Sequence, residues 1–512
     1  MAQINVTNLT FCYDGSFDNI FENVSFSIDT SWKLGLIGRN GKGKTTFLNL
    51  LRGRMEYQGT ISGNTVFDYF PYVVAERDLV KSASELMGEW KPSVEEWRVL
   101  CELAGLRLDA EVLYRPFGTL SQGERRKVML AVLFGGEQDF LLIDEPTNHL
   151  DRQSRETIKE YLGSKEGFIL VSHDRDLLDA CVDHVLVLNR QTIEVQSGNF
   201  SSWWENKQRK DNFARMENEK HLKEIGKLRT AADRSARWAE KNENTKIGFD
   251  PVKEPDRMVG TRAYIGAKTK KMQSRVKSYE VRMEREIREK EGLLQDLETC
   301  VDLKIKPLVY HKERLVRAYE FGLKYRDAGQ WLFEDMSFEL SRGERVFLAG
   351  DNGCGKSSLI KAILQTAEEK PDEKLEKKGV LETASGLVIS YINQDTSFLK
   401  GTVKEFCRAR KLEESLFLAL LRKLDMNREQ FGKNMEEYSE GQKKKVLIAA
   451  SLMTPAHLYI WDEPLNYIDV FSRMQIEKLI TTYKPTMLLV EHDVRFREEI
   501  ATKVLEIYRQ TV

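Results

Sequence analysis

Two glycine-rich segments in this chain end in a lysine followed by a hydroxyl residue. GRNGKGKT covers residues 38–45, and GDNGCGKS covers residues 350–357. Each follows an apolar run and opens a helix-like run, so its glycines would let backbone N–H groups converge on phosphate oxygens at a helix N-terminus. The lysine suits β- and γ-phosphates and the hydroxyl suits Mg²⁺, so the two segments predict two nucleotide-binding loops.

Each predicted loop contributes a run of candidate nucleotide contacts. In the first loop these are Gly38, Arg39, Asn40, Gly41, Lys42, Gly43, Lys44, Thr45 and Thr46. In the second loop they are Gly350, Asp351, Asn352, Gly353, Cys354, Gly355, Lys356, Ser357 and Ser358. Within these loops Lys44 and Lys356 should reach the β- and γ-phosphates, while Thr45 and Ser357 should hold Mg²⁺.

The two loops belong to a longer repeat. The segment LSQGE recurs as YSEGQ, and LLIDEP recurs as YIWDEP. Lys356 lies 312 residues after Lys44, and Glu463 lies 318 residues after Glu145, so the order and spacing of the motifs are kept. The chain therefore contains two copies of one domain of roughly 200 residues.

Two acidic pairs follow apolar strands downstream of the loops, one in each copy. The aspartate of each pair suits the Mg²⁺ shell, and the glutamate after it could polarise the water that attacks the γ-phosphate. A histidine follows a later apolar strand in each copy, and its recurrence indicates a contact with the γ-phosphate. The predicted Mg²⁺ ligands are Asp144 and Asp462, and the predicted catalytic residues are Glu145, Glu463, His173 and His492.

Strand-like and helix-like runs alternate within each copy. Mostly apolar runs such as KLGLIG, FLLID and FILVSHD are typical of buried strands, and TTFLNLLRG after the first loop is typical of a helix. This alternation predicts an α/β fold with a largely parallel sheet. We expect one nucleotide-binding domain at residues 1–200, a helical linker at residues 201–308 and a second nucleotide-binding domain at residues 309–512.

The order of these motifs resembles the ATP-binding cassette superfamily, and the resemblance covers both copies. It implies a monomer in which two cassettes pack head to tail with two Mg²⁺–ATP between them. The loop with Lys44 would then face YSEGQ, the loop with Lys356 would face LSQGE, and the segments NHLD and NYID would couple the two sites. Two tyrosines would stack on adenine, and a glutamine would sense Mg²⁺ and water. The residues implied in this way are Ser121, Gln122, Gly123, Ser439, Glu440, Gly441, Tyr13, Tyr325 and Gln394.

One position departs from the pattern of that superfamily. Gln394 lies in YINQD of the second copy, whereas the aligned first-copy segment YFPYVV places Tyr72 there. A phenol cannot reproduce the acceptor and donor pair of an amide. We therefore expect the site containing Lys44 to hydrolyse ATP more slowly than the site containing Lys356.

The segment between the two copies has a different character. Dense charge and an apolar seam close to heptad spacing predict two long helices. The seam positions are Phe213, Met216, Ile225, Leu228 and Ala232 in the first arm and Met272, Val276, Tyr279, Met283, Ile287, Leu294 and Leu297 in the second. Glycines and prolines between residues 248 and 260 predict a looped tip, so the segment favours an antiparallel hairpin. Arms of ~35 residues would reach about 50 Å.

Basic residues gather near this expected tip. Residues 257–282 hold eight lysines and arginines against one acidic residue, although the whole chain is balanced at 79 basic and 80 acidic residues. A run of one sign on a projecting element favours a polyanionic partner over a merely solvated face, and aromatic residues there could stack on RNA bases. The expected contacts are Lys246, Phe249, Arg257, Arg262, Tyr264, Lys268, Lys270 and Lys271.

Two complete cassettes joined by a charged helical hairpin resemble the ABC-F group, whose members act on ribosomes. The stretch AYIGAKTKKMQSRVKSYEVR is similar to that of antibiotic-resistance members of the Lsa type. This resemblance implies a cytoplasmic ATPase that binds the exit site of the 70S ribosome in its ATP-bound state. Its hairpin would reach 23S rRNA and P-site tRNA, and would protect the peptidyl-transferase centre from lincosamides, pleuromutilins and group A streptogramins.

Three other functions stay open from the sequence alone. The nearest is a housekeeping translation factor of the same group. An ATPase subunit of a membrane transporter would leave the basic tip unexplained, and we expect no membrane subunit as a partner. A DNA-maintenance ATPase of the excision-repair type would need zinc-binding cysteine pairs, whereas the six cysteines form no C-x-x-C pair.

Overall fold

The computed structural model covers most of both copies and part of the segment between them. The described residues are 3–13, 19–39, 41, 43–136, 139–148, 150–188, 193–244, 270, 274, 277, 278, 281–283, 285, 286, 304–326, 330–369 and 374–508. The chain divides into two compact units, of which one is Met1–Trp203 with Cys300–Val512 and the other is Trp204–Thr299. The domain boundaries expected at residues 200 and 308 stay predictions.

The first copy is built on a six-stranded sheet with the strand order β5-β6-β7-β3-β8-β9. Its pairs are parallel except β8 with β9, which is antiparallel. The strands are β3 Lys33–Gly38, β5 Val66–Phe70, β6 Asp139–Asp144, β7 Phe168–Val171, β8 His184–Leu188 and β9 Ile193–Ser197. A smaller antiparallel sheet consists of β1 Gln3–Phe11, β2 Phe21–Asp29 and β4 Gln58–Ser62.

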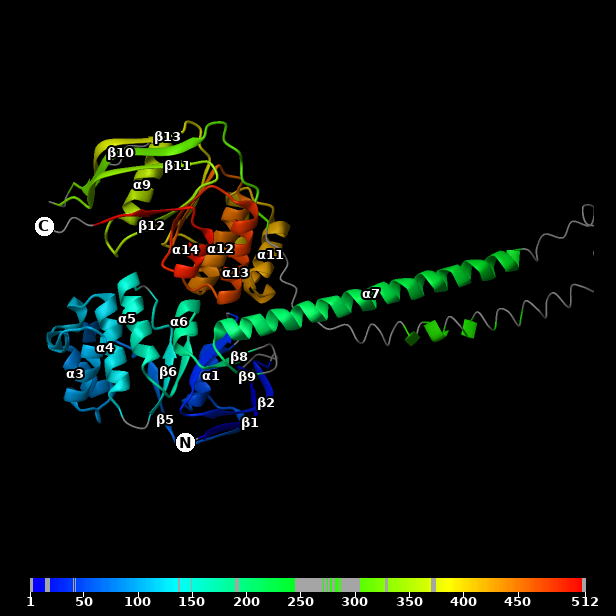
Figure 1. Cartoon of the computed structure of the whole chain (residues 1–512), viewed down its shortest axis with the longest axis horizontal. Coiled ribbons are helices and arrows are strands. Elements are labelled where there is room, and N and C mark those ends of the chain that lie inside the picture. The colour runs from blue at the N-terminus through cyan, green and yellow to red at the C-terminus, as the bar shows by residue number, and fades with distance from the viewer. Residues whose placement is uncertain are drawn as a thin grey trace, which may run out of the picture. The chain divides into compact units, whose positions relative to one another are not determined.

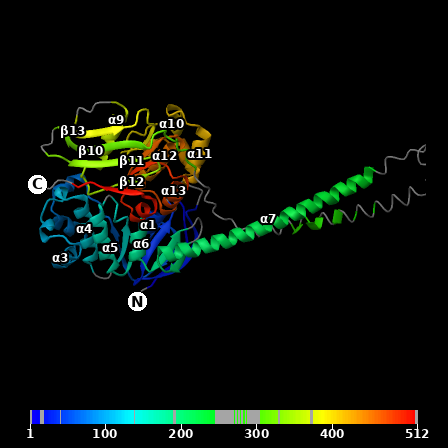
Figure 2. The same ribbon diagram turned by 45° about the horizontal axis from the view of Figure 1, so that its top comes forward.

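The second copy repeats this plan with a parallel sheet in the order β14-β15-β16-β12-β17. These strands are β12 Arg345–Ala349, β14 Ile389–Ile392, β15 Leu458–Asp462, β16 Met487–Val490 and β17 Lys503–Glu506. The antiparallel sheet consists of β10 Arg314–Tyr325, β11 Phe333–Ser341 and β13 Leu375–Thr383. It forms a separate layer that packs on the first helix of the copy, α9 Lys356–Ala367 (Figures 1 and 2).

Helices cover the parallel sheets in both copies (Figure 1). In the first copy they are α1 Lys44–Leu51, α2 Ala83–Trp90, α3 Glu96–Gly105, α4 Gln122–Phe134, α5 Arg152–Gly163 and α6 Arg175–Cys181. In the second copy they are α9 Lys356–Ala367, α10 Val403–Ala409, α11 Glu414–Lys423, α12 Glu440–Met453, α13 Val470–Tyr483 and α14 Val494–Ile500. Short 3₁₀ helices are η1 Glu76–Val80, η2 Ala110–Leu113, η3 Phe117–Thr119, η4 Arg428–Gly432 and η5 Met435–Glu437.

The central strands are buried on both faces, as apolar parallel strands should be. All residues of β7, β15 and β16 are buried, and the core of the second copy includes Tyr459 and Trp461. The predicted α/β fold with two copies of one domain is confirmed. Because the strands of each copy are parallel, their carboxyl ends, which carry the acidic pairs and the histidines, lie at one edge of the sheet.

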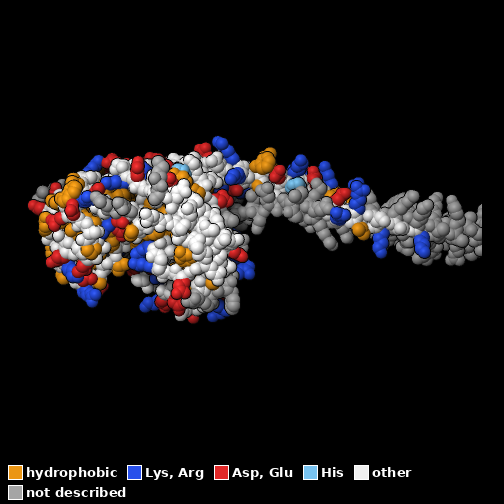
Figure 3. Space-filling model, turned by 90° about the horizontal axis from the view of Figure 1, so that it is seen from below, with side chains coloured by type: hydrophobic (Ala, Val, Ile, Leu, Met, Phe, Trp, Pro, Cys, Tyr) orange, Lys and Arg blue, Asp and Glu red, His pale blue; other side chains and the backbone are white. Residues whose placement is uncertain are grey.

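The segment between the copies contains one long described helix, α7 Phe200–Asn244. Ala214 and Ile225 are buried on it, whereas Phe213 and Met216 are 64% and 71% exposed, so these two residues were wrongly placed in the seam. Ala214 and Ile225 are 11 residues apart, which corresponds to three full helical turns and places them on one face. Basic and acidic side chains are interspersed along the described part of α7 (Figure 3).

Little of the second arm is described. Residues 270, 274, 277, 278, 281–283, 285 and 286 are helical, and Met283, a predicted seam residue, is buried. The predicted seam positions Met272, Val276, Tyr279, Ile287, Leu294 and Leu297 lie outside the described residues. Across the part of the chain that is described, no helix is long and apolar enough to cross a membrane.

Candidate nucleotide sites

Each predicted phosphate loop leads directly into a helix that begins at its lysine. The glycine before that lysine lies in the left-handed region, with φ 89° at Gly43 and φ 101° at Gly355. A Cβ on Gly43 would lie 2.6 Å from the side chain of Ile20, so the backbone there approaches its neighbour too closely for another residue. Lys356 Nζ donates to the carbonyl oxygens of Gly350 at 2.7 Å and Asp351 at 2.9 Å. The loops therefore curl around their own ammonium groups, as a phosphate cradle requires.

The two predicted Mg²⁺ aspartates end central strands beside the loop hydroxyls. Thr45 Oγ1 donates to Asp144 Oδ2 at 3.4 Å. Burial raises the pKa of Asp462 even though the Ser357 hydroxyl opposes this shift. Asp462 Oδ1 is buried without a hydrogen-bond partner among the described residues. An unsatisfied buried carboxylate oxygen next to a hydroxyl fits a hard cation such as Mg²⁺.

In the second copy, the predicted catalytic glutamate is held by two amides. Glu463 Oε2 accepts from Gln394 Nε2 at 2.8 Å and from Asn466 Nδ2 at 2.7 Å. His492 Nε2 lies 3.6 Å from Glu463 Oε1. Burial opposes ionisation of Glu463, but the hydrogen bonds and the nearby cation Lys444 lower its pKa below the usual value. This carboxylate is therefore ionised and held in a fixed orientation by two amides, which suits a general base.

In the first copy, the equivalent glutamate has a different environment. Burial and the neighbouring Asp144 raise the pKa of Glu145 to about 8. His173 Nε2 lies 3.4 Å from Glu145 Oε1, but no side-chain amide of the described residues donates to this carboxylate. Glu145 therefore retains its proton to a higher pH than Glu463, so a smaller fraction of it is in the ionised form that can accept a proton from water.

Tyr72 takes the place in the first copy that the amide of Gln394 has in the second copy. Strand register pairs Phe70 with Ile143 and Ile392 with Trp461, which places Tyr72 and Gln394 at equivalent positions two residues beyond their strands. The Tyr72 hydroxyl donates to Asp68 Oδ2 at 2.7 Å, and its ring stacks on Trp90 at 4.9 Å between centroids. Tyr72 is thus committed to contacts other than the carboxylate of Glu145.

The two predicted adenine tyrosines lie beside their loops. Tyr13 Oη is 2.7 Å from Thr46 Oγ1, and Tyr325 Oη is 2.9 Å from Ser358 Oγ. Both rings remain partly exposed, so a flat base can stack on them. Tyr325 also lines a cavity of about 410 Å³ together with Lys356, Gln394 and Glu463.

Residues of one copy reach the loop of the other. Arg155 of the first copy lines the cavity that contains Lys356. Burial lowers the pKa of Lys44, and Asp469 of the second copy opposes that shift. Ser121 and Ser439 are the N-caps of α4 and α12, where each hydroxyl accepts from a backbone N–H three residues on.

The family model described as ABC transporter matches residues 21–148 and 333–466, which together make up more than half of the chain. This chain belongs to the ABC transporter family. It is therefore an ATPase with two ATP-binding cassettes, and the resemblance of its tandem cassettes to the ABC-F group is confirmed.

Curated relatives match this ABC protein over nearly its whole length. The ribosome protection protein VmlR of Bacillus subtilis (strain 168) is 28% identical to this chain. The match covers 98% of this chain and 86% of VmlR. The erythromycin resistance ATP-binding protein MsrA of Staphylococcus epidermidis is 26% identical, and that match covers 94% of this chain and 93% of MsrA. The solved complex of archaeal ribosomal stalk protein aP1 with the archaeal ribosome recycling factor aABCE1 matches with a TM-score of 0.59, 18% identity, and coverage of 98% and 87%, which shows a shared fold.

Several predicted residues of this ABC protein lie outside the part of the chain that the structure describes. Asn40 and Lys42 of the first loop lie outside the described residues. The same holds for the predicted tip residues Lys246, Phe249, Arg257, Arg262, Tyr264, Lys268 and Lys271, and only Lys270 is described, as an exposed helical residue.

The residues that join the two cassettes were not predicted from the sequence. Arg175 forms a buried bidentate ion pair with Glu477, and Arg495 bonds to Asp176 of the first cassette at 2.6 Å. Asn466, which holds Glu463, was also missed as an individual contact. Asn148 occupies the matching place three residues after Glu145, so the repeat itself carried a signal for Asn466.

Proposed function

We propose that this ABC ATPase binds ribosomes in its ATP-bound state and protects the large subunit from antibiotics. The observation that carries this proposal is the 28% identity to a protein named as a ribosome protection protein, because the match covers 98% of the chain and so includes the segment between the cassettes. A relative named for erythromycin resistance supports it. Such a role would make the protein cytoplasmic.

Hydrolysis at the Lys356 site follows from the groups around Glu463. Bound Mg²⁺–ATP would supply the γ-phosphorus and a metal charge that spreads over the phosphate oxygens. Asp462 and Ser357 would hold the metal with Gln394. Glu463 Oε2, positioned by Gln394 and Asn466, would accept a proton from the attacking water, and His492 would orient the γ-phosphate. Glu145, with its raised pKa, would make the Lys44 site the slower one.

The start of α7 provides a route from the cassettes to the linker. The backbone N–H and hydroxyl of Ser201 donate to Asp179 of the first cassette at 2.7 Å and 2.5 Å. Arg495 of the second cassette reaches the same Ser201 hydroxyl at 3.2 Å. Closure of the cassettes on two ATP molecules would therefore act on the first turn of the linker helix.

The finer function concerns the tip of the linker. We propose that the basic tip enters the ribosomal exit site, contacts 23S rRNA and P-site tRNA, and remodels the peptidyl-transferase centre so that lincosamides, pleuromutilins and group A streptogramins leave. Hydrolysis would then open the cassettes and release the ribosome. The electrostatic reason is the excess of lysine and arginine between residues 257 and 282.

Cosedimentation with 70S ribosomes tests the proposal. The double variant Glu145→Gln, Glu463→Gln should bind ATP and stay closed, so it should pellet with ribosomes in ATP and remain in the supernatant without nucleotide. Failure to pellet, with ATP binding shown intact, would overturn the ribosome proposal and favour a transporter subunit. Pelleting without any rise in drug tolerance when the gene is expressed in a susceptible host would instead identify a housekeeping translation factor.

A further inference from the structure

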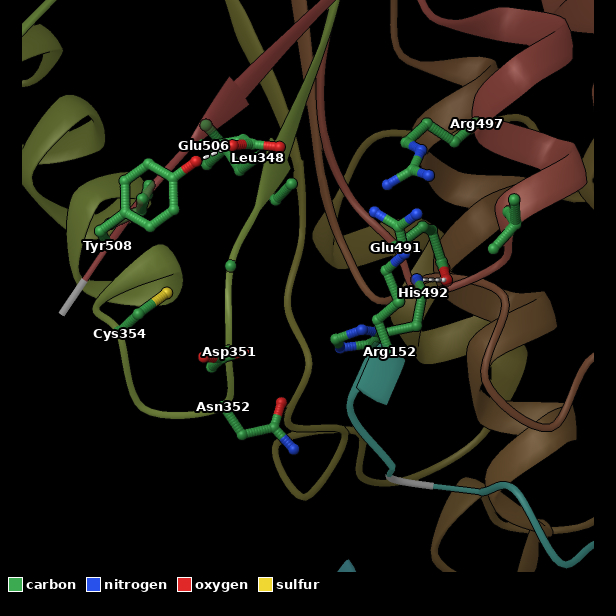
Figure 4. Close-up of a pocket in the computed structure, with 14 residues that line it drawn as sticks. Arg152, Leu348, Asp351, Asn352, Cys354, Glu491, His492, Arg497, Glu506 and Tyr508 are labelled. Carbon is green, nitrogen blue, oxygen red and sulfur yellow. Dashed lines mark hydrogen bonds between the residues drawn. The ribbon is translucent and has the colours of Figure 1, made fainter. Parts of the chain in front are cut away.

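A second cavity adjoins the Lys356 loop on the side away from the adenine tyrosine. Its volume is about 580 Å³, and it is lined by the end of β12, the residues after β17, the start of α14 and one residue of the first cassette, Arg152. Figure 4 shows Arg152, His492 and Arg497 on one wall and Asp351, Asn352 and Cys354 on the opposite wall. None of the functions above uses this space.

Two arginines give this cavity a chemical character. Arg152 and Arg497 line it, and neither guanidinium has a hydrogen bond or ion pair with any residue that the structure describes. The carboxylates nearby are engaged: Glu506 accepts from the Tyr508 hydroxyl, and Glu491 accepts from the backbone N–H groups of Leu465 and His492. Asp351 is the remaining acidic residue of the lining, on the wall opposite the arginines (Figure 4). Paired arginines without partners in one cavity favour a small multivalent anion.

The cavity connects with the nucleotide cavity. Asn352 and His492 line both of them. Asn352 belongs to the phosphate loop and His492 is the predicted γ-phosphate contact, so the boundary between the two cavities lies where the γ-phosphate is expected. An anion that leaves this position away from adenine would enter the space beside Arg152 and Arg497.

The Lys44 site has no counterpart of these arginines. Arg497 lies five residues after His492, and the residue five after His173 is Leu178. Arg152 follows Asp151, and the residue that follows Asp469 is Val470. Leu178 and Val470 are 0% and 3% exposed. At the positions equivalent to the two arginines the Lys44 site therefore has buried apolar side chains.

We propose that inorganic phosphate leaves the Lys356 site through this cavity, with Arg152 and Arg497 as its transient binding site, while ADP stays bound. Water adds to the γ-phosphorus, the bond to the β-phosphate oxygen breaks, and the products are ADP and orthophosphate with one proton released. Orthophosphate then passes between Asn352 and His492 into the arginine-lined space. The proposal rests on the assignment of hydrolysis to the Lys356 site.

Comparing cleavage with release tests the route. In a Glu145→Gln background, a single turnover of γ-³²P-labelled ATP is stopped with acid to measure cleavage, and a fluorescent phosphate-binding sensor measures free orthophosphate. In the variant Arg152→Gln, Arg497→Gln, cleavage should keep its rate and release should lag by about five- to tenfold, the effect of losing charge-assisted contacts. A second variant, Val494→Trp, should obstruct the cavity and produce a longer lag. The matched control is Glu498→Gln, on the exposed face of α14.

The results of this experiment either support or overturn the proposed release route. Release that keeps pace with cleavage in both variants would overturn the proposal. Cleavage and release that fall together would also overturn it, because the arginines would then act on the chemical step. The underlying assignment fails separately, if adding Glu463→Gln to the Glu145→Gln background leaves cleavage unchanged. Ribosomes are absent from the assay, so the result is independent of the proposed partner.

Discussion

Arg495 of the second cassette donates through Nη2 to Asp179 Oδ2 of the first cassette at 2.5 Å. The same carboxylate binds Ser201, at the first turn of α7. Arg495 and Asp179 lie on α14 and α6, the helices that directly follow His492 and His173. One ion pair therefore connects both histidine segments with the start of the linker.

Arg495→Ala should uncouple the linker from the cassettes. ATP hydrolysis should remain within about twofold, because Arg495 contacts no described residue of either loop. ATP-dependent ribosome pelleting should weaken about tenfold, the scale of hydrogen bonds to charged groups. Pelleting of Arg495→Ala and of the exposed control Arg408→Ala, measured over a ribosome titration, checks this. Equal pelleting of the two variants would contradict the coupling.

Arg175→Ala should destabilise the chain by about 3 kcal/mol, because it leaves Glu477 buried without its partner. Glu477→Gln should cost less, since burial already raises the pKa of Glu477 to about 7 and an amide can still accept from Arg175. Urea unfolding of the two variants gives the comparison. A larger cost for Glu477→Gln would show that the carboxylate charge itself holds the pair.

The two ATP sites should differ in rate. Glu463→Gln should reduce steady-state ATPase activity by about 100-fold, within the range for loss of a general base, whereas Glu145→Gln should reduce it only severalfold. Gln394→Tyr should resemble Glu463→Gln, because it removes the amide that positions Glu463. Single-turnover assays of the three variants measure this order, and equal residual rates for the two glutamate variants would count against it.

Glu491 makes the stability of the folded chain depend on pH. Burial raises its pKa to about 7 from 4.5, although the Leu465 N–H and Arg473 oppose the shift. Because the folded state holds the proton more tightly than the unfolded state, the stabilisation is complete below about pH 4.5 and is lost as the pH rises through 7. Relative to Glu491→Gln, the thermal midpoint of the wild type should therefore fall between about pH 5 and pH 8. If the thermal midpoints of the wild type and of Glu491→Gln change in parallel with pH, Glu491 makes no such contribution.

Phe249→Ala should lower drug tolerance and leave ATPase activity unchanged, because the predicted tip contributes bulk and stacking rather than chemistry. Growth of a susceptible host that expresses the variant, with increasing lincosamide, measures the effect. Unchanged tolerance at equal protein levels would remove Phe249 from the proposed tip contacts.

Most of the fold and of the ATP sites could be predicted from local patterns in the sequence. The alternation of apolar runs and the glycine loops predicted the sheets and the placement of Lys44 and Lys356, because these features depend on neighbouring residues. Tyr72 could be aligned with Gln394, but its rotation towards Trp90 depends on a side-chain contact that spacing does not encode. The heptad reading misplaced Phe213 and Met216, since the buried positions of α7 follow an 11-residue spacing.

The contacts between the cassettes could not be predicted from the sequence, for a different reason. Arg175, Arg495 and Glu477 are ordinary charged residues on helices, and their pairing depends on residues about 300 positions away. A pattern within one copy cannot reveal such a pair, because its partner does not repeat: Arg495 aligns with Asp176, which is itself one of its partners.

The pairing of Arg495 with its own counterpart, Asp176, makes the two halves of the chain non-interchangeable. A symmetric dimer of two second halves would set arginine against arginine at this contact. A dimer of two first halves would set aspartate against aspartate and would lack Gln394 at both sites. The two halves have thus diverged at this contact into complementary partners, each of which carries the side chain that the other one binds.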